Sequence, residues 1–411
     1  MTGARRPTGF AAALAVGEFR ALWVAEAQSV VGDQLAKVAV SVVVYGRTGS
    51  AGLAAVSYAA LLLPALVSGP LLSGLADVYP RRAVMVVCAL VQAVLVALMA
   101  VPGTPIAALF GLIVVVQLAQ APFLAAQAAL LPVVLDGEAY QAAQALRQIT
   151  RQVGMLLGLG FGGMAIAVVG VSWALAVDAA TFVVVAVVIR CGVRHRAAAA
   201  TPSAGAEAGF LRGVGLIWSD PRLRSLVALA WLAGFAVVPE GLAVPFADSV
   251  GAGPTAVGWL LAVDPAAMAV GAYLLVRLVP VEVRLRLLGP LAVLTVIPLV
   301  GYAAEPGLAG ALVLLAVSGF CAAYQVTASA TFMEWVPDAQ RGQAYGIARS
   351  GLVAAQGLGV LAGGVLAELT GSVSRAVALA GAAGVLVAGP AAIAWHRAYT
   401  RHRVPVGTGV A

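Results

Sequence analysis

Twelve apolar segments, each long enough to cross a lipid bilayer, dominate this sequence. A membrane-spanning helix needs about 20 predominantly apolar residues, and Pro, Gly and charged residues bound runs of that length along the chain. The runs lie at residues 20–45, 52–75, 83–102, 105–131, 144–168, 171–190, 225–246, 255–277, 286–304, 307–333, 344–367 and 375–395. The pattern predicts an all-α integral membrane protein with twelve transmembrane helices.

The composition excludes a soluble protein of this length. Hydrophobic residues make up 62% of the 411 residues and charged residues only 10%, whereas a soluble domain carries about 25% charged residues. A long soluble chain must cover its cores with polar groups. A soluble enzyme, a nucleic-acid binder and a disordered scaffold are therefore excluded.

One longer polar stretch divides the spans into two sets of six. It runs from Cys191 to Arg224 and includes RHRAAAATPSAGAEAG, a composition typical of a flexible linker. We predict an N-terminal six-helix bundle at 1–191, a cytoplasmic linker at 192–224 and a C-terminal six-helix bundle at 225–411.

The basic residues predict the orientation of the chain. It has 23 Arg and one Lys, and with the N-terminus inside, 21 of these Arg lie in or beside cytoplasmic segments. Only Arg47 and Arg375 fall outside, a bias that the positive-inside rule requires. The excess of Arg, Ala, Gly and Val indicates a bacterial source. We expect a multi-pass protein of the bacterial plasma membrane with both termini in the cytoplasm.

The two halves share a sequence pattern. Pro132 precedes glycines at 158–163, and Pro337 precedes glycines at 359–364, about 200 residues later. Two parallel six-span repeats resemble the arrangement of major facilitator superfamily transporters. The resemblance implies the major facilitator fold, in which two six-helix bundles rock about a central cavity.

The loop between spans 2 and 3 resembles a signature of that superfamily. It reads SGLADVYPRRAVM and contains Asp77, Arg81 and Arg82. The resemblance implies a gating latch, in which the Asp caps a helix of the opposite half and the bases pair with nearby carboxylates. An acid at a helix N-terminus is favourable. The alternative is an ordinary positively charged cytoplasmic loop.

Span 5 resembles the antiporter signature of major facilitator exporters. It reads GMLLGLGFGG, with Leu159 where the signature has Pro. Its glycines at spacings that allow close helix packing are Gly154, Gly158, Gly162 and Gly163. We expect Gly158, Gly162 and Gly163 to form a flat face that slides against span 11 or span 8 of the other half. The alternative is generic packing of small residues.

Longer stretches resemble one branch of the superfamily. FRALWVAEAQSVVGDQLAKVAV, LLPALVSGPLLSGLAD and VPDAQRGQAYG are similar to the macrolide-efflux and enterobactin exporters of drugs and siderophores. The resemblance implies export of an amphipathic antibiotic, natural product or siderophore, and hence multidrug resistance or siderophore export.

Span 1 carries three ionisable residues along one helical stripe. The only lysine, Lys37, follows Asp33 by four residues and Glu26 by eleven. A lone Lys at the bilayer centre costs about 2.5–3.5 kcal/mol on insertion scales, and such residues usually face a cavity. We predict that Asp33 takes part in proton coupling or substrate contact. The alternative is a purely structural ion pair.

Other polar residues inside the spans complete the predicted cavity. Glu240 follows Pro239 in span 7, where Pro interrupts the helix beside a polar site. Asp178 is a further acid inside a predicted span, and we interpret it as a residue that ties helices together. The remaining cavity candidates, all inside predicted spans, are Gln34, Gln117, Gln120, Asp264 and Gln325. Span 4 contains no Arg, although many proton-coupled drug exporters of the superfamily carry one there.

Motifs for catalysis and cofactor binding are absent from the sequence. The three His lie in basic flanks, and the three Cys are isolated. We expect no enzyme activity, no cofactor and no metal.

We therefore predict a monomeric transporter that exchanges protons for an amphipathic small molecule by alternating access. Its expected partners are this substrate, protons and membrane lipid, and not nucleic acid. Two alternatives stay open: a lipid or lysophospholipid translocator on the same fold, and a non-transporting sensor or partner-binding membrane protein. A membrane-embedded enzyme would need a convergent nucleophile or metal cluster, and none is visible in the sequence.

Overall fold

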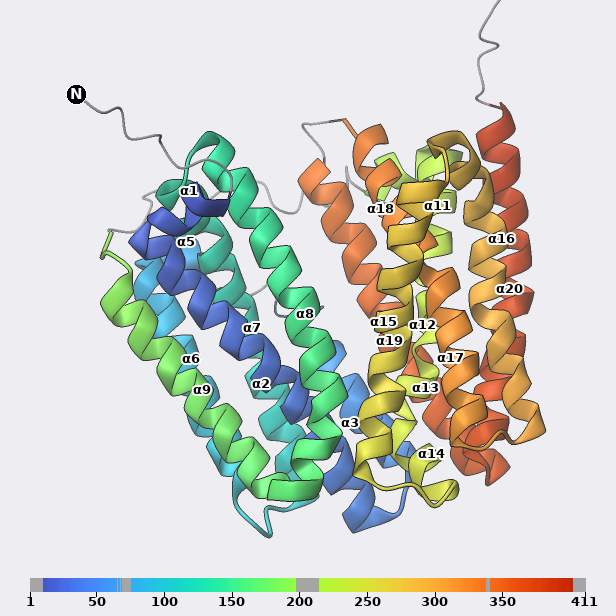
Figure 1. The fold of residues 1–411 in the computed structure, drawn as a ribbon, viewed down its shortest axis with the longest axis horizontal. Helices are drawn as coiled ribbons and strands as arrows, with labels where there is room; N and C mark the ends of the chain where they lie inside the picture. The colour runs from blue at the N-terminus through green and yellow to red at the C-terminus, as the bar shows by residue number, and fades with distance from the viewer. Residues whose placement is uncertain are drawn as a thin grey trace, which may run out of the picture. The chain divides into compact units, whose positions relative to one another are not determined.

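The computed structural model describes residues 10–64, 66, 68, 75–196, 214–337 and 341–401, and all regular elements there are helices (Figure 1). Among these residues, eleven helices are long and apolar enough to cross a membrane. A shorter apolar helix, α3 (Ala51–Leu62), occupies the start of predicted span 2. The predicted all-α membrane fold is confirmed.

The first part of the chain forms long helices that follow the predicted spans. Each apolar run continues into a helix because a backbone in lipid must satisfy its own hydrogen bonds. The elements are α1 (Phe10–Ala15), α2 (Gly17–Thr48), α3, α5 (Leu75–Val78), α6 (Arg81–Ala100), α7 (Ile106–Val134), α8 (Gly137–Val169) and α9 (Val171–Gly192).

The second part of the chain begins with a broken span. Predicted span 7 forms α11 (Pro221–Trp231), α12 (Ala233–Ala236), α13 (Val238–Gly241) and α14 (Ala243–Ser249). The expected interruption near Pro239 is present, since Pro lacks the N–H that an α-helix needs. The later helices are α15 (Pro254–Leu278), α16 (Val281–Val300), η1 (Gly301–Ala304), α17 (Leu308–Ala322), α18 (Tyr324–Trp335), α19 (Arg341–Thr370) and α20 (Val373–Arg401).

The chain separates into two compact units. The first contains residues 1–203 and 247–262, and the second contains residues 204–246 and 263–411. Residues 247–262 thus group with the first unit, although they follow the linker in the sequence. The division into bundles at 191 and 225 stays a prediction.

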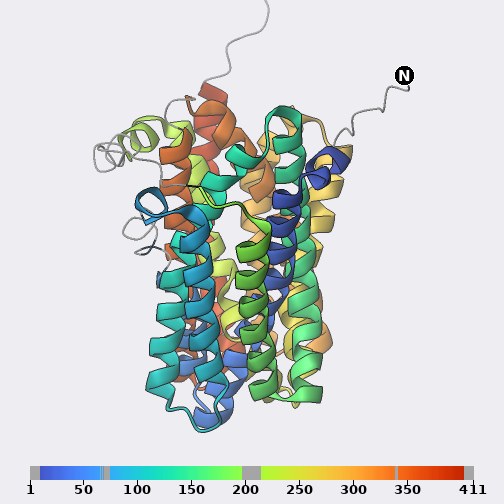
Figure 2. The same ribbon diagram turned by 90° about the vertical axis from the view of Figure 1, so that its left-hand side faces the viewer.

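Within the first unit, α2 packs against α8 and α9, and α6 packs against α7 and α9. Figure 2 shows the long axes of these helices roughly aligned. Phe19, Met85, Leu130 and Ile189 are buried in their shared core. This packing places the polar stripe of α2 against α8 and α9.

Within the second unit, α16 packs against α17 and α20, while α19 packs against α12, α13 and α20. The Trp395 side chain is buried, and its Nε1 donates to the Leu285 carbonyl at 2.8 Å. Tyr324 is also fully buried in this core. The unit therefore has a packed interior of its own.

Candidate functional site

Glu26 of α2 is held in a buried ion pair. Arg147 of α8 donates from Nη2 to Glu26 Oε1 at 3.1 Å and to Gln127 Oε1 of α7 at 2.8 Å, and its Nε also donates to Glu26 Oε2. Arg151 Nη1 lies 3.6 Å from Glu26 Oε1. The network joins α2, α7 and α8, because Glu26 belongs to α2, Gln127 to α7, and both arginines to α8.

Two residues of this network, Arg147 and Glu26, have surroundings that differ from those expected from the sequence. Arg147 was counted only among the basic residues of the cytoplasmic side, but its side chain is only 7% exposed and is held inside the protein. Glu26 was expected to line the cavity, yet its carboxylate is engaged by Arg147. The reason is helix packing: α8 continues as a helix from Gly137, so residue 147 lies inside the bundle.

Asp33, Gln34 and Lys37 lie further along α2, as the spacing predicts. Lys37 Nζ donates to Gln34 Oε1 at 3.1 Å, and its charge interacts with that of Asp33. Asp33 also interacts electrostatically with Asp178 of α9. The site therefore contains two carboxylates and one ammonium group at the packed faces of α2 and α9.

Asp178 reaches this site because α2 has a glycine beside it. The Asp178 carboxylate lies against Gly32, at a position where any Cβ would overlap Asp178 Oδ1. Only 1% of Asp178 is exposed. Thr181 Oγ1 lies 3.4 Å from Asp178 Oδ1 and donates to the Asp178 carbonyl at 2.7 Å. Gly32 thus sets the close approach of the two helices.

The glutamines of α7 are engaged by neighbouring helices. Gln117 Nε2 donates to the Leu61 carbonyl of α3. Gln120 Oε1 accepts from Gln92 Nε2 of α6 at 2.6 Å. These bonds tie α7 to α3 and α6. Gln92 was missed in the sequence, where it is a lone polar residue in an apolar run.

A second set of predicted residues lies in the second unit. The charge of Asp264 on α15 interacts with that of Glu240 on α13. Both residues are half-buried, as is Gln325 on α18. Gln325 contacts Tyr324, whose hydroxyl donates to the Leu229 carbonyl at 2.7 Å. The interrupted span therefore does place Glu240 beside another acid.

The glycines of predicted span 5 face two different neighbours. A Cβ at Gly158 would lie 2.7 Å from Gln34 Cβ of α2, and Gly154 and Gly162 also face α2. Gly163 packs against the backbone at Pro254 of α15, within the same unit. The expectation that Gly158, Gly162 and Gly163 share one face toward span 11 or span 8 is wrong for Gly158 and Gly162, which contact α2, whereas Gly163 does meet the start of predicted span 8. The spacing of Gly154, Gly158 and Gly162 places these three on the face that α2 covers.

The predicted latch is described only in part. Asp77 falls in α5, but its side chain lies outside the described residues. Arg81 Nη1 donates to the Ala129 carbonyl at 2.9 Å, and Arg82 Nη1 donates to the Val193 carbonyl at 3.1 Å. These two arginines thus bind backbone carbonyls, whereas pairing with carboxylates was expected. Val193 caps the C-terminus of α9, where positive charge is favourable.

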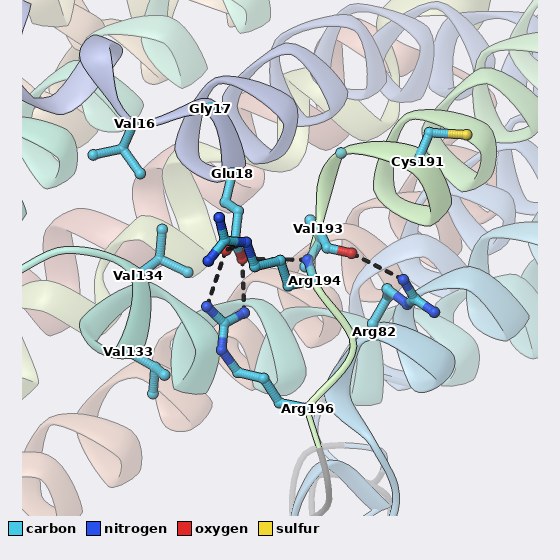
Figure 3. Close-up of a pocket in the computed structure, with 11 residues that line it drawn as sticks. Val16, Gly17, Glu18, Arg82, Val133, Val134, Cys191, Val193, Arg194 and Arg196 are labelled. Atoms are coloured by element: carbon cyan, nitrogen blue, oxygen red, sulfur yellow. Dashed lines mark hydrogen bonds and ion pairs between the residues drawn. The ribbon is translucent and has the colours of Figure 1, made fainter.

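A charged pocket of about 690 Å³ lies beside these helix ends (Figure 3). Glu18 accepts two hydrogen bonds from Arg196, at 2.7 and 3.0 Å, and lies 3.5 Å from Arg194 Nε. The bonds to Glu18 raise the pKa of the Arg196 guanidinium above its ordinary value. Arg82 lines the same pocket. Nothing in the sequence indicates this pocket, because its arginines are only part of the positively charged cytoplasmic side and Glu18 is a single acid at the start of an apolar run.

The comparisons with known proteins identify the family. The family model of the Major Facilitator Superfamily matches residues 9–239 and 241–409. The chain belongs to this superfamily, and it is a multi-pass membrane transporter by fold. No protein in a search of curated sequences matches the chain.

Several solved structures share the fold. A bacterial homologue of the human lysosomal transporter Spinster, inward-facing and unoccupied, is 14% identical with a TM-score of 0.71, over 95% of this chain and 99% of its own. The nucleoside transporter NupG is 15% identical with a TM-score of 0.67, over 94% and 99%. A POT family transporter in complex with 5-aminolevulinic acid is 9% identical with a TM-score of 0.73, over 92% and 96%. Identities this low establish the fold alone.

Proposed function

We propose that this protein is a proton-coupled exporter of amphipathic small molecules that works by alternating access. The observation that carries the proposal is the group formed by Asp33, Lys37 and Asp178 at the packed faces of α2 and α9. Ionisable residues inside membrane spans are costly and mark substrate or proton paths. The substrate class is an antibiotic, a natural product or a siderophore.

Asp33 is the proton-binding residue of this mechanism. Lys37 attracts its ionised carboxylate, while the neighbouring Asp178 repels it. A change in the position of either neighbour therefore changes the charge that Asp33 can hold, because Coulomb energies are large where water is scarce. A proton bound at Asp33 in one state is released when substrate enters in the other.

The proposed coupling between helix movement and Asp33 rests on the glycine contacts of α8. Gly154, Gly158 and Gly162 bring α8 against the helix that carries Asp33, and Gly163 brings it against α15. A movement of α8 would therefore shift α2, the helix that carries Asp33. Glu240 and Asp264 supply a second pair of acids for substrate or proton binding. The protein acts as a monomer in the bacterial plasma membrane, with Asp77, Arg81 and Arg82 as its cytoplasmic latch.

Transport assays in inverted membrane vesicles test the proposal. A panel of macrolides, dyes and siderophores is offered with an imposed proton gradient and after its collapse by an uncoupler. We expect accumulation of at least one amphipathic compound that stops on collapse of the gradient. Gradient-driven movement of fluorescent lysophospholipid alone would favour a lipid translocator, and no gradient-dependent movement of any compound would favour a non-transporting membrane protein.

A further inference from the structure

The pocket around Glu18 is lined by charged residues of which the proposed transport mechanism uses only Arg82. Arg82, Arg194 and Arg196 line it together with a single acid, Glu18. Three guanidinium groups against one carboxylate leave an excess of two positive charges. Val133 and Val134 add an apolar wall at the end of α7. A pocket that is both cationic and partly apolar suits an amphipathic anion.

The positive charges retain hydrogen-bonding capacity. A guanidinium group has five N–H donors, and the bond to the Val193 carbonyl uses one donor of Arg82. The Arg194 side chain is 85% exposed, and its contact with Glu18 is long, at 3.5 Å. Arg82 and Arg194 can therefore both donate to a further acceptor in the pocket without losing these contacts.

The start of α2 adds to the positive potential. Val16, the N-cap residue of this 32-residue helix, makes no side-chain capping bond, and it lines the pocket with Gly17. The first N–H groups of a helix and its dipole both favour an anion. Phosphate groups are bound at helix N-termini for this reason.

The pocket lies where four helices that could span a membrane begin or end, and lipid headgroups are expected at such helix ends. It is formed by the first residues of α2 and α6 and the last residues of α7 and α9, four helices that are long and apolar enough to span a membrane. Its volume of about 690 Å³ falls within the range of small-molecule sites. Basic pockets at such helix ends bind anionic headgroups.

We propose that this pocket binds the phosphate group of an anionic membrane lipid, with Arg194 and Arg82 as donors. The glycerol and first acyl carbons lie against Val133 and Val134. Glu18 holds Arg196 in place and limits the affinity, because its carboxylate repels the phosphate. The variants at Arg194 and Glu18 must therefore change binding in opposite directions.

Native mass spectrometry of the full-length protein in detergent tests this site. The probes are dioleoylphosphatidylglycerol and, as a zwitterionic control with no net charge, dioleoylphosphatidylcholine. We expect preferential retention of phosphatidylglycerol, about fivefold weaker binding for Arg194→Gln, since one basic residue near a membrane surface contributes about that factor, and tighter binding for Glu18→Gln. Arg190→Gln, which removes an exposed charge of α9 outside the pocket lining, should bind like the wild type.

Competition distinguishes the source of the phosphate. Glycerol 3-phosphate and inorganic phosphate, added in excess, should not displace the lipid if acyl contacts contribute. Displacement at concentrations equal to the lipid would support the phosphate site but assign it to soluble phosphates. Equal retention of the two lipids, or equal effects of Arg194→Gln and Arg190→Gln, would overturn the proposal. Because Arg194 is exposed, that outcome does not depend on a misfolded variant.

Discussion

Arg147 Nη2 lies 3.1 Å from Glu26 Oε1, and only 7% of each side chain is exposed. The same guanidinium group reaches Gln127 at 2.8 Å, so one arginine of α8 binds both α2 and α7. Removal of one partner from a buried pair leaves the other charge uncompensated. The pair is thus a structural tie beside the proposed transport site.

Glu26→Gln should lower the free energy of unfolding by about 3–5 kcal/mol, the cost of leaving a buried charge without its partner. Unfolding of the purified protein in detergent, followed by circular dichroism, measures this change. Glu305→Gln is the matched control, because its partner Arg375 lies 3.6 Å away and both side chains are more than 60% exposed. That exposed pair should contribute no more than about 1 kcal/mol.

The double variant Glu26→Leu/Arg147→Met should be more stable than either single variant, since no charge stays buried alone. Coupling is read from the four unfolding free energies of the cycle. If the two single effects simply add, Glu26 and Arg147 do not interact as the structure describes.

Lys37→Met should destabilise the protein by about 2 kcal/mol, below the roughly 3–5 kcal/mol of a fully buried pair because Lys37 and Asp33 are half-buried. Asp33→Asn/Lys37→Met should be milder than Lys37→Met alone. Lys37→Arg, which keeps the positive charge, should be nearly as stable as the wild type. Unfolding free energies that add strictly across the cycle would mean that the charges of Asp33 and Lys37 do not interact.

The transmembrane helices could be predicted from the sequence because the signal is local. An apolar run of about 20 residues must be helical in lipid, and predicted span 83–102 coincides closely with α6. Helix ends were less predictable. α20 continues to Arg401, six residues past the predicted end at 395, since polar residues outside the bilayer continue a helix that has begun inside it.

The polar stripe of α2 could be predicted for the same reason, but its partners could not. Spacings of four and seven residues place Asp33 and Lys37 with Glu26 on one helical face. Arg147 follows Glu26 by 121 residues in the sequence, and Asp178 is likewise more than 100 residues after Asp33. Which helices cover that face is decided by packing of whole helices, and no spacing within one segment records it.

The neighbours of the α8 glycines could not be predicted for the same reason. Their spacing correctly indicates close packing of small residues, but it does not say which helix approaches. The contact of Gly158 with Gln34 connects this motif to the polar stripe of α2.

Gly158→Ala should separate α8 from α2, because the added Cβ would lie 2.7 Å from Gln34 Cβ and 3.0 Å from the Val31 carbonyl oxygen. We expect a loss of stability of about 1–3 kcal/mol, typical of overpacking, and slower transport. Gly111→Ala in α7 is the control, because nothing lies within 4 Å of its Cβ. Equal losses of stability for Gly158→Ala and Gly111→Ala would mean that close packing of Gly158 against α2 does not stabilise the protein.

Asp33→Asn should abolish gradient-driven transport and leave the protein folded, because asparagine keeps the shape of the side chain but cannot release a proton. The measurement is uptake into inverted vesicles, with substrate exchange in the absence of a gradient measured in parallel. Exchange needs alternating access but no net proton movement, so it should persist while gradient-driven uptake falls at least tenfold. Asp136→Asn is the matched control, since Asp136 is exposed and its side chain does not cap α8. Wild-type uptake by Asp33→Asn would exclude Asp33 as the coupling residue, and Asp178→Asn and Glu240→Gln would then identify which remaining acid carries the proton.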